Sequence, residues 1–277
     1  MNSTTGRLRK MVTEHQSPIS YKLRVEKELI ALNPLIGSEL KIRHTGRILC
    51  INCDRVTRKS FSQGYCYNCF CRLAETDTCI MSPEKCHFDQ GTCRDPEWAQ
   101  SHCMQPHVVY LANTSGLKVG ITRSDQVPVR WMDQGAIDAL PIAVVSERKL
   151  AGVVEDQLRE HVSDRTQWQR MLKGEAPELD LDQQWQSLQR LAANELDSIA
   201  ESYSEDDISF KDTTPEQTLS FKYPLEDPPA KVKAMNLDKT PEVAGVLTGI
   251  KGQYLIFETG VLNVRKFTGY EVEVSYQ

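Results

Sequence analysis

All nine cysteines of the chain fall between Cys50 and Cys103, and the other four-fifths of the sequence contains none. The first four form two Cys-x2-Cys pairs, Cys50 with Cys53 and Cys66 with Cys69, with twelve residues between the pairs. A two-residue gap lets both sulfurs of a pair face one point, and two such pairs at this distance are typical of a ribbon that wraps four thiolates around one zinc ion. A disulfide framework is the alternative, but the sequence has no secretory signal. The spacing therefore predicts a Zn²⁺ site.

A second set of cysteines follows, with irregular gaps of six, six and nine residues. Thiolates at this density repel one another unless a cation neutralises them, so we expect a second Zn²⁺. Four thiolates leave zinc no open coordination position, which makes both sites structural. An iron–sulfur cluster is an alternative, because sequence does not fix the metal. The expected ligands are Cys79, Cys86, Cys93 and Cys103, with His87, His102 or His107 as alternatives to one cysteine and Cys71 as the leftover thiol.

The composition is that of an ordinary globular protein. The 277 residues are 40% hydrophobic and 26% charged, which is close to the average for such proteins. No apolar run approaches the roughly 18 residues that cross a membrane. The N-terminus, MNSTTGRLRKMVTEHQ, lacks the apolar core of a signal peptide. We therefore expect a cytoplasmic protein without a membrane partner.

The net charge of −5 is spread unevenly along the chain. Residues 1–73 contain thirteen Lys and Arg against five Asp and Glu, a net charge of +8. Residues 174–227 contain three against fourteen, a net charge of −11. A basic region on an acidic protein is typical of a selective polyanion binder, so nucleic acid, either DNA or RNA, is the expected partner. The alternative is that such charge runs are only solvated faces, and the acidic segment 174–227 is a candidate surface for a protein partner.

Hydrophobic patterning predicts an α+β protein whose two ends are rich in strands. Alternating apolar residues place Leu23 and Val25, and then Leu40 and Ile42, on repeating faces of N-terminal strands. Glycines divide the C-terminal segment into four short strands, which is typical of a small β-barrel that the N-terminal strands help to complete. The predicted regions are 1–49 (β), 50–106 (zinc-binding), 107–173 (β-β-α-β-α), 174–217 (acidic helix and linker) and 218–277 (β).

Two segments of the central region have a helical pattern. Residues 149–162 place Leu150, Ala151, Val154 and Leu158 on one apolar stripe. Residues 182–200 predict a single helix, followed by an exposed linker at 201–217. The expected apolar face of that second helix contains Trp185, Leu188, Leu191 and Ile199.

Residues 107–162 resemble the GIY-YIG endonuclease superfamily, and most closely its divergent phage-associated branch. VVY at 108–110 is similar to the first motif and KVG at 118–120 to the second, with nine residues between Tyr110 and Gly120. The resemblance implies a nuclease in which Tyr110 lies near the nucleophile, Arg130 contacts the phosphate and Glu155 holds one Mg²⁺ or Mn²⁺ ion. Lys118 replaces the second tyrosine of the usual pattern and is the fourth candidate catalytic residue.

The whole chain also resembles a little-characterised bacterial family of unknown function, through its cysteines, YLA…LKVGITR and RW.DQGA. We therefore expect a zinc-stabilised protein that binds nucleic acid through its N-terminal strands and first zinc site. The GIY-YIG-like segment makes phosphodiester cleavage the expected activity. A non-catalytic DNA- or RNA-binding module and a protein-interaction scaffold are the alternatives.

Overall fold

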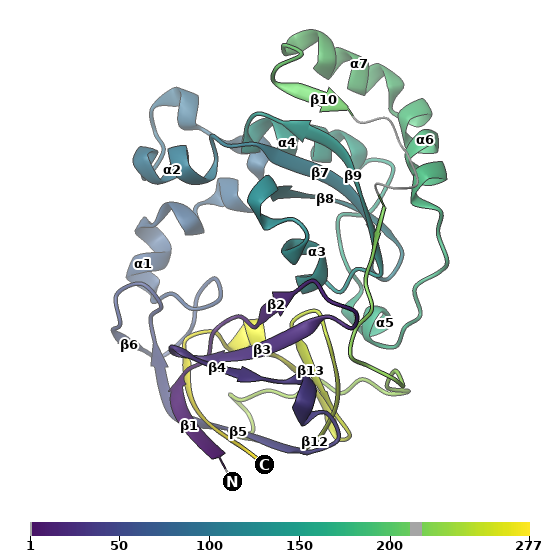
Figure 1. Ribbon diagram of the computed structural model, residues 1–277. Helices are drawn as coiled ribbons and strands as arrows, with labels where there is room; N and C mark the ends of the chain where they lie inside the picture. The colour runs from purple at the N-terminus through teal and green to yellow at the C-terminus, as the bar shows by residue number, and fades with distance from the viewer. Residues whose placement is uncertain (1, 211–217) are drawn as a thin grey trace. The chain divides into compact units, whose positions relative to one another are not determined.

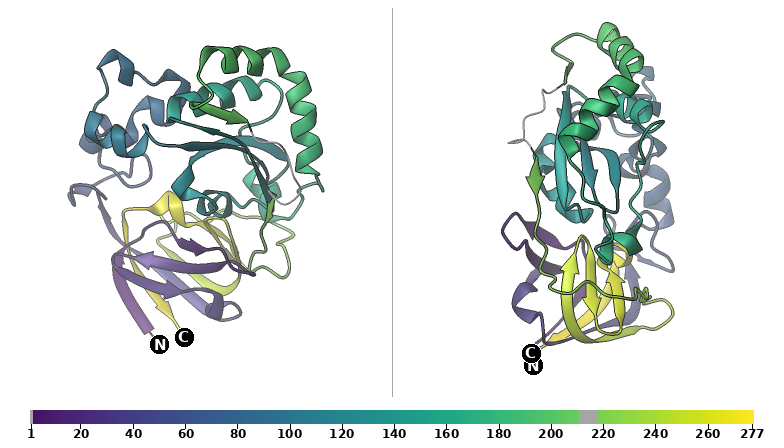
Figure 2. Two further views of the ribbon diagram at one scale, coloured as in Figure 1. Left: turned by 45° about the horizontal axis from the view of Figure 1, so that its top comes forward. Right: turned by 90° about the vertical axis from the view of Figure 1, so that its right-hand side faces the viewer.

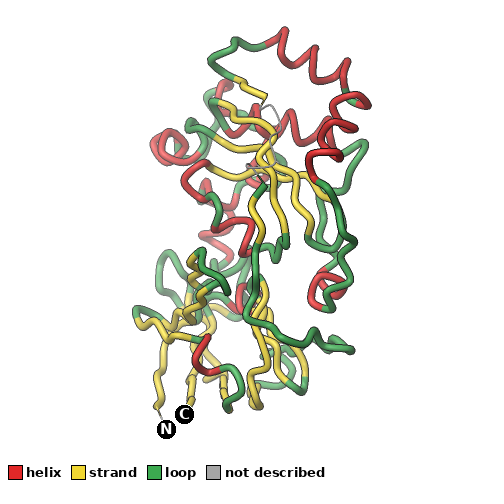
Figure 3. The backbone as a smooth tube through the Cα atoms, turned by 45° about the vertical axis from the view of Figure 1, so that its right-hand side comes forward, coloured by secondary structure: helices red, strands yellow, loops and turns green. Residues whose placement is uncertain are grey.

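The computed structural model of the protein describes residues 2–210 and 218–277. The chain divides into two compact units. Unit 1 contains Met1–Cys71 and Lys222–Gln277, and unit 2 contains Arg72–Phe221. This division runs through the cysteine-rich segment 50–106, so the first four cysteines belong to unit 1 and the second set to unit 2. The α+β class is confirmed: strands dominate unit 1, and most of the helices are in unit 2 (Figure 3).

Unit 1 is built by strands from both ends of the sequence. Its seven-stranded sheet has the order β1-β15-β5-β12-β13-β14, with β6 paired to β5, and a second sheet has the order β2-β3-β4. Asn2 pairs with Tyr276, so the two termini lie side by side (Figure 1, Figure 2). Leu23, Leu40 and Ile42 are fully buried, as their alternation predicts.

The four predicted C-terminal strands are present, whereas closure into a barrel stays a prediction. The strands are β1 (Asn2–Arg7), β2 (Val12–Glu14), β3 (Ser20–Val25), β4 (Glu28–Ala31), β5 (Glu39–Leu49), β6 (Val56–Thr57), β12 (Glu242–Lys251), β13 (Tyr254–Phe257), β14 (Gly260–Asn263) and β15 (Tyr270–Tyr276). The helical elements are η1 (Asn33–Leu35), α1 (Tyr67–Arg72) and η8 (Val264–Phe267).

Unit 2 contains an antiparallel sheet of order β10-β9-β7-β8, with β11 paired to β9. From residue 107 its elements follow the order β-β-α-β-α, and the first strand of this series, β7, is central in the sheet. The elements are β7 (His107–Asn113), β8 (Leu117–Arg123), η6 (Ser124–Gln126), α3 (Val129–Asp133), β9 (Asp138–Val145) and α4 (Arg148–Leu158).

The cysteine-rich part of unit 2 precedes this sheet, and further helices follow it. Before the sheet lie η2 (Ala74–Thr76), η3 (Thr78–Ile80), η4 (Pro83–Lys85), η5 (Phe88–Gln90) and α2 (Pro96–His102). After it come α5 (Trp168–Leu172), α6 (Leu181–Leu191), α7 (Ala193–Ser202), β10 (Ile208–Phe210) and β11 (Leu219–Ser220). In the described part of the chain, no helix combines the length and apolar character that crossing a membrane requires.

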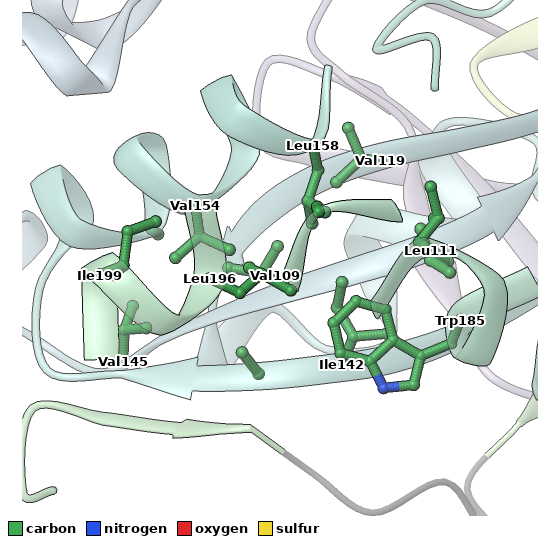
Figure 4. Close-up of a cluster of buried hydrophobic side chains, with 14 of the residues drawn as sticks. Val109, Leu111, Val119, Ile142, Val145, Val154, Leu158, Trp185, Leu196 and Ile199 are labelled. Atoms are coloured by element: carbon green, nitrogen blue, oxygen red, sulfur yellow. The ribbon is translucent and has the colours of Figure 1, made fainter. Parts of the chain in front are cut away.

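One face of the unit 2 sheet carries the hydrophobic core. Side chains of α4, α6 and α7 gather there against alternate residues of the strands, among them Val109 and Leu111 of β7 (Figure 4). The predicted stripe of α4 is confirmed, because Leu150, Ala151, Val154 and Leu158 are all buried.

Two details of the 174–217 prediction are wrong. The single helix is two, α6 and α7, separated at Ala192, and Leu191 is 64% exposed. Ala192 is fully buried and lies four residues after Leu188, so it takes the place on the apolar face that Leu191 was expected to fill. The predicted linker contains β10, which pairs with β9. Residues 211–217 lie outside the described residues.

Replacing Trp185, a large and fully buried side chain, tests the packing of this core. Trp185→Ala is expected to lower the free energy of unfolding by about 3–5 kcal/mol, because it empties a fully buried site. Leu191→Ala, on the exposed side of the same helix, is the control and is expected to change it by less than about 0.5 kcal/mol. Urea denaturation followed by circular dichroism measures both, and equal losses would contradict the observed orientation of α6.

Candidate functional site

The first candidate metal centre lies in unit 1 and consists of Cys50, Cys53, Cys66 and Cys69. Their sulfur atoms all lie within 4.8 Å of one another. The Sγ atoms of Cys53 and Cys66 are 3.7 Å apart. Zn–S bonds of about 2.3 Å in a tetrahedral site place sulfurs about 3.8 Å apart, so the four cysteines are compatible with a structural metal ion such as zinc.

Backbone N–H groups at this centre favour the thiolate form of Cys50. Burial opposes ionisation of Cys50, but the backbone N–H groups of Cys66, Cys53 and Asn52 outweigh it and lower its pKa to about 6. The Asn52 side-chain amide also donates a hydrogen bond of 3.4 Å to Sγ of Cys69. All nine cysteines are free thiols, and the exposed Cys71 lies outside the cluster. Donors aimed at sulfur favour thiolates, the form in which cysteine binds metal. At Cys69 the Asn52 hydrogen bond is outweighed by burial and by the three neighbouring cysteines, which raise its pKa to about 12, so a bound cation would be needed to hold all four as thiolates.

The second cysteine set, in unit 2, is arranged less compactly. Among the described residues, the close group here is Asp77, Cys79 and His87, whose ligand atoms lie within 4.8 Å of one another. Burial raises the pKa of Cys79 to about 11, and the negative charges of Asp77 and of the other three cysteines, Cys86, Cys103 and Cys93, add to the shift. The four predicted cysteines therefore lie close enough to influence one another's ionisation. A carboxylate, Asp77, and a histidine, His87, lie beside Cys79.

The other two candidate histidines have different surroundings. His102 stacks on Trp98, with the ring centroids 4.3 Å apart. His107 is fully buried, its Nδ1 lies 2.7 Å from the carbonyl oxygen of Gln105, and burial lowers its pKa to about 4. Neither belongs to the close group among the described residues, which leaves His87 as the histidine beside Cys79.

The second cysteine segment packs against α4. The backbone N–H of Arg148 donates to the Cys103 carbonyl at 2.8 Å, and its Nη2 donates to the Ile80 carbonyl at 2.8 Å. A Cβ on Gly152 would lie 2.5 Å from Cβ of Pro83, so only glycine permits this contact without a shift. The Nε of Arg148 is buried without a hydrogen-bond partner. Burial lowers the pKa of Arg148, and the charges of Cys103 and Cys79 oppose this shift. A half-buried cation beside these thiols fits an anionic metal–thiolate centre.

The four candidate catalytic residues lie on four elements of unit 2 and interact electrostatically. Tyr110 is on β7, Lys118 on β8, Arg130 on α3 and Glu155 on α4. The charges of Arg130 and Glu155 affect the ionisation of both Tyr110 and Lys118. These interactions connect residues that are up to 45 positions apart in the sequence, from Tyr110 to Glu155.

Tyr110 is held in place from several sides. It is fully buried and pairs in register with Gly120, where a Cβ would lie 2.7 Å from the tyrosine hydroxyl. The hydroxyl donates to Oε1 of Gln134 at 2.9 Å, and the positive charge of Arg130 acts on it. The ring packs edge-on against Trp131, with the centroids 5.6 Å apart. Burial raises the pKa of Tyr110, so the phenol is neutral near pH 7.

Lys118 and Glu155 influence each other electrostatically without pairing. Lys118 is only 5% exposed, and Glu155 is half-buried. Among the residues that the structure describes, neither forms an ion pair. Burial lowers the pKa of Lys118 to about 8, with Arg130 adding to the shift while Glu155 and Asp164 oppose it. Burial raises the pKa of Glu155, and the charge of Lys118 opposes this shift.

Sequence reasoning missed three residues of these sites. Gln134 follows α3 and accepts the Tyr110 hydrogen bond, Asp77 lies beside Cys79, and Arg148 joins α4 to the cysteine segment. Asp77 lies two residues before a candidate ligand, a spacing that could have identified it. No motif marks Gln134 or Arg148, because their roles depend on tertiary contacts.

The first cluster predicts a specific loss of metal. Cys53→Ser and Cys66→Ser are each expected to remove one equivalent of bound zinc and to lower the melting temperature by at least about 10 °C, since metal binding here contributes to folding. Cys71→Ser is the matched control and is expected to keep both properties. Elemental analysis and thermal melts measure them, and full zinc content in Cys53→Ser would contradict the assignment.

The buried Lys118 predicts a pH-dependent stability difference. Below pH 8 the ammonium is charged in the folded chain, whereas between pH 8 and about 10.4 only the unfolded chain keeps the proton. The cost of burying the charge is therefore complete at low pH and disappears as the pH rises. Lys118→Met is expected to be more stable than wild type at pH 7, by up to roughly 3 kcal/mol, and equally stable above pH 10.

Urea denaturation between pH 6 and 10.5, without added divalent metal, measures this difference. Lys231→Met, at an exposed lysine of unit 1, is the control and is expected to show no trend with pH. A constant difference between Lys118→Met and wild type would show that Lys118 is not desolvated.

Comparisons with known proteins identify a family but no activity. No curated protein matches the chain, and no solved structure matches it. Residues 37–272 match the family described as "Protein of unknown function (DUF2797)". The matched span includes both cysteine sets and the four candidate catalytic residues. The chain therefore belongs to DUF2797, a family of proteins of unknown function.

Proposed function

We propose that this protein binds nucleic acid and cleaves phosphodiester bonds in unit 2, at a site that contains Tyr110, Lys118, Arg130 and Glu155. The observation that carries the proposal is the electrostatic coupling of these four side chains, which come from separate elements. A buried cation, an arginine, a phenol and a carboxylate are the groups that a phosphoryl-transfer site needs.

The GIY-YIG resemblance supports the same assignment. The elements follow the order β-β-α-β-α, and Tyr110 of the first motif pairs directly with Gly120 of the second. Alternation along paired strands places Lys118 on the same face of the sheet as Tyr110. Lys118 thus takes the place of the second motif tyrosine with its charge directed toward the same site.

Each side chain has a role that its contacts support. Arg130 presents a guanidinium that can bind two phosphoryl oxygens, and Lys118 adds a second positive charge. Tyr110 donates a hydrogen bond to Gln134 and is fully buried, so its neutral phenol does not deprotonate the attacking water. It instead helps to position the neighbouring Arg130, whose charge acts on it.

Glu155 is the proposed ligand of a divalent cation. A half-buried carboxylate that has no ion pair among the described residues fits Mg²⁺ or Mn²⁺, which commonly bind through one or two carboxylates, water and substrate phosphate. When bound, such an ion supplies positive charge next to the leaving oxygen. Asp164, whose charge also acts on Glu155, adds negative charge on this side of the site.

We also propose a second zinc site in unit 2. Cys79, Cys86, Cys93 and Cys103 remain its ligands, and Asp77 and His87 are the alternatives that lie beside Cys79. The half-buried Arg148 would balance the charge of the thiolates. Since Arg148 begins α4, the metal would fix the helix that carries Glu155.

Cleavage assays test the enzymatic assignment. The purified protein is incubated with duplex, single-stranded and branched DNA and with structured RNA, in Mg²⁺ or Mn²⁺. Glu155→Gln and Arg130→Ala are each expected to lower the cleavage rate by about 10²–10³-fold, because each removes charge stabilisation from the transition state. Glu160→Gln, at an exposed carboxylate just beyond α4, is the matched control and is expected to keep the rate.

The outcome separates the enzyme from a binding module. Cleavage that persists in both site variants would reject the site. Salt-dependent binding without strand scission on any substrate would instead support a non-catalytic nucleic-acid-binding protein.

A further inference from the structure

Part of the positive charge in the N-terminal region of unit 1 is neutralised by ion pairs. Three cations of the long strand β5 each form an ion pair with a glutamate of a neighbouring strand, β12 or β15. These pairs are Lys41 with Glu242, Arg43 with Glu273 and Arg47 with Glu271. Paired in this way, β5 offers little net charge to a polyanion, so the binding surface must lie elsewhere in unit 1.

Unneutralised positive charge remains next to the first metal centre. Arg55, Arg58 and Lys59 lie between the two Cys-x2-Cys pairs and are exposed. Among the described residues, none of the three forms an ion pair. A Zn²⁺ ion bound by four thiolates keeps a net charge of about minus two, which three cations exceed. This short segment therefore places three exposed positive charges beside the first cysteine cluster.

Aromatic rings lie beside these cations. Tyr67, between Cys66 and Cys69, is 61% exposed, and its ring packs edge-on against Phe61 with the centroids 5.5 Å apart. Phe61 in turn stacks on Phe70, and Nζ of Lys59 lies 5.2 Å from the Phe61 centroid. Because Tyr67 lies within a Cys-x2-Cys pair, the metal centre would hold this exposed ring rigid.

A groove lies along the same segment. It has a volume of about 670 Å³ and is lined in part by Val56, Arg58, His44 and Asp238. Val56 is 61% exposed and gives this groove an apolar wall. Ligand sites commonly have volumes of about 300–1,000 Å³ and combine apolar walls with a few polar groups. The groove is therefore large enough for a nucleotide, next to the unpaired Arg58.

We infer that Arg55, Arg58, Lys59, Phe61 and Tyr67 form a stacking platform for single-stranded nucleic acid, and that one nucleotide enters the adjacent groove. The cations bind the phosphates, and an unstacked base packs on the open face of Tyr67. In a duplex the bases stack on one another and are not available to a protein ring, so the platform selects single strands. DNA and RNA share this chemistry. The inference names the substrate class for the proposed nucleic-acid function, on which it rests.

Binding of short oligonucleotides to the full-length protein tests the platform. Fluorescence anisotropy is measured with labelled oligo-dT and oligo-U of twelve nucleotides and with a twelve-base-pair duplex, without added Mg²⁺ or Mn²⁺. We expect at least one single strand to bind roughly tenfold or more tightly than the duplex. Tyr67→Ala is expected to weaken single-strand binding about tenfold through loss of stacking, and Tyr67→Phe is expected to keep it. The oligo-dT and oligo-U arms show which sugar is preferred.

Charge variants locate the phosphate contacts. Arg58→Ala is expected to weaken binding and to reduce its dependence on salt concentration, because fewer counterions are released. The matched control is Arg43→Ala, which removes a cation that is already paired with Glu273, and it is expected to leave affinity unchanged. Zinc content and melting temperature of each variant verify that the fold is intact.

Three results would overturn the platform: equal affinity for duplex and single strands, wild-type affinity in an intact Tyr67→Ala variant, or equal losses in Arg58→Ala and Arg43→Ala. Binding is measured separately from scission, so the two proposals fail independently. If single strands bind as expected but nothing is cleaved, the platform stands and the proposed nuclease activity is rejected. If cleavage occurs and Tyr67→Ala does not change it, the unit 2 site stands and the platform plays no part in cleavage.

Discussion

Where hydrophobic packing is scarce, the chain gathers four cysteines into a cluster that is compatible with a structural metal ion such as zinc. In the first cluster, sulfurs from two separate Cys-x2-Cys pairs approach to 3.7 Å, a spacing that a shared cation stabilises and mutual repulsion would otherwise oppose. The segment between the pairs has little regular structure beyond the two-residue strand β6 and a tight turn. Hydrogen bonds from the Ile51 backbone N–H to Gly64 and from Ser60 Oγ to the Thr268 carbonyl connect it to its surroundings. A bound metal ion would further restrain the cysteines on either side of the exposed Tyr67.

The second cysteine segment is connected to the candidate active site through α4. This helix faces two partners: its buried stripe packs on the sheet, and Gly152 packs on Pro83 of the cysteine segment. Arg148 adds hydrogen bonds to two carbonyl groups of that segment. Glu155 lies seven residues further along the same rigid helix. A disturbance of the second cysteine set therefore changes the position of a candidate metal-binding carboxylate without touching it.

Local patterns could be predicted from the sequence, whereas contacts between distant segments could not. The buried stripe of α4 and the alternation of Leu40 and Ile42 follow directly from helical and strand periodicity. The pattern predicts Leu191 on the buried face because leucine is more hydrophobic than alanine. In the structure Ala192 occupies that buried position and Leu191 is exposed. The ion pairs that neutralise β5 join residues about 200 positions apart or more, so a count of charges along the chain overestimated the basic surface.

The strongest argument for a functional site in unit 2 is that burying Lys118 without an ion pair lowers the free energy of unfolding. A structural role for Lys118 and Glu155 would be served best by a direct ion pair, which would offset the cost of removing both charges from water. Instead the two side chains form no ion pair among the described residues, and Lys118 is only 5% exposed with its pKa lowered to about 8. An unpaired buried cation is retained against a stability cost when a ligand provides the missing charge. A phosphate between Lys118, Arg130 and a cation on Glu155 would provide it, which explains why the site is polar and incompletely paired without substrate.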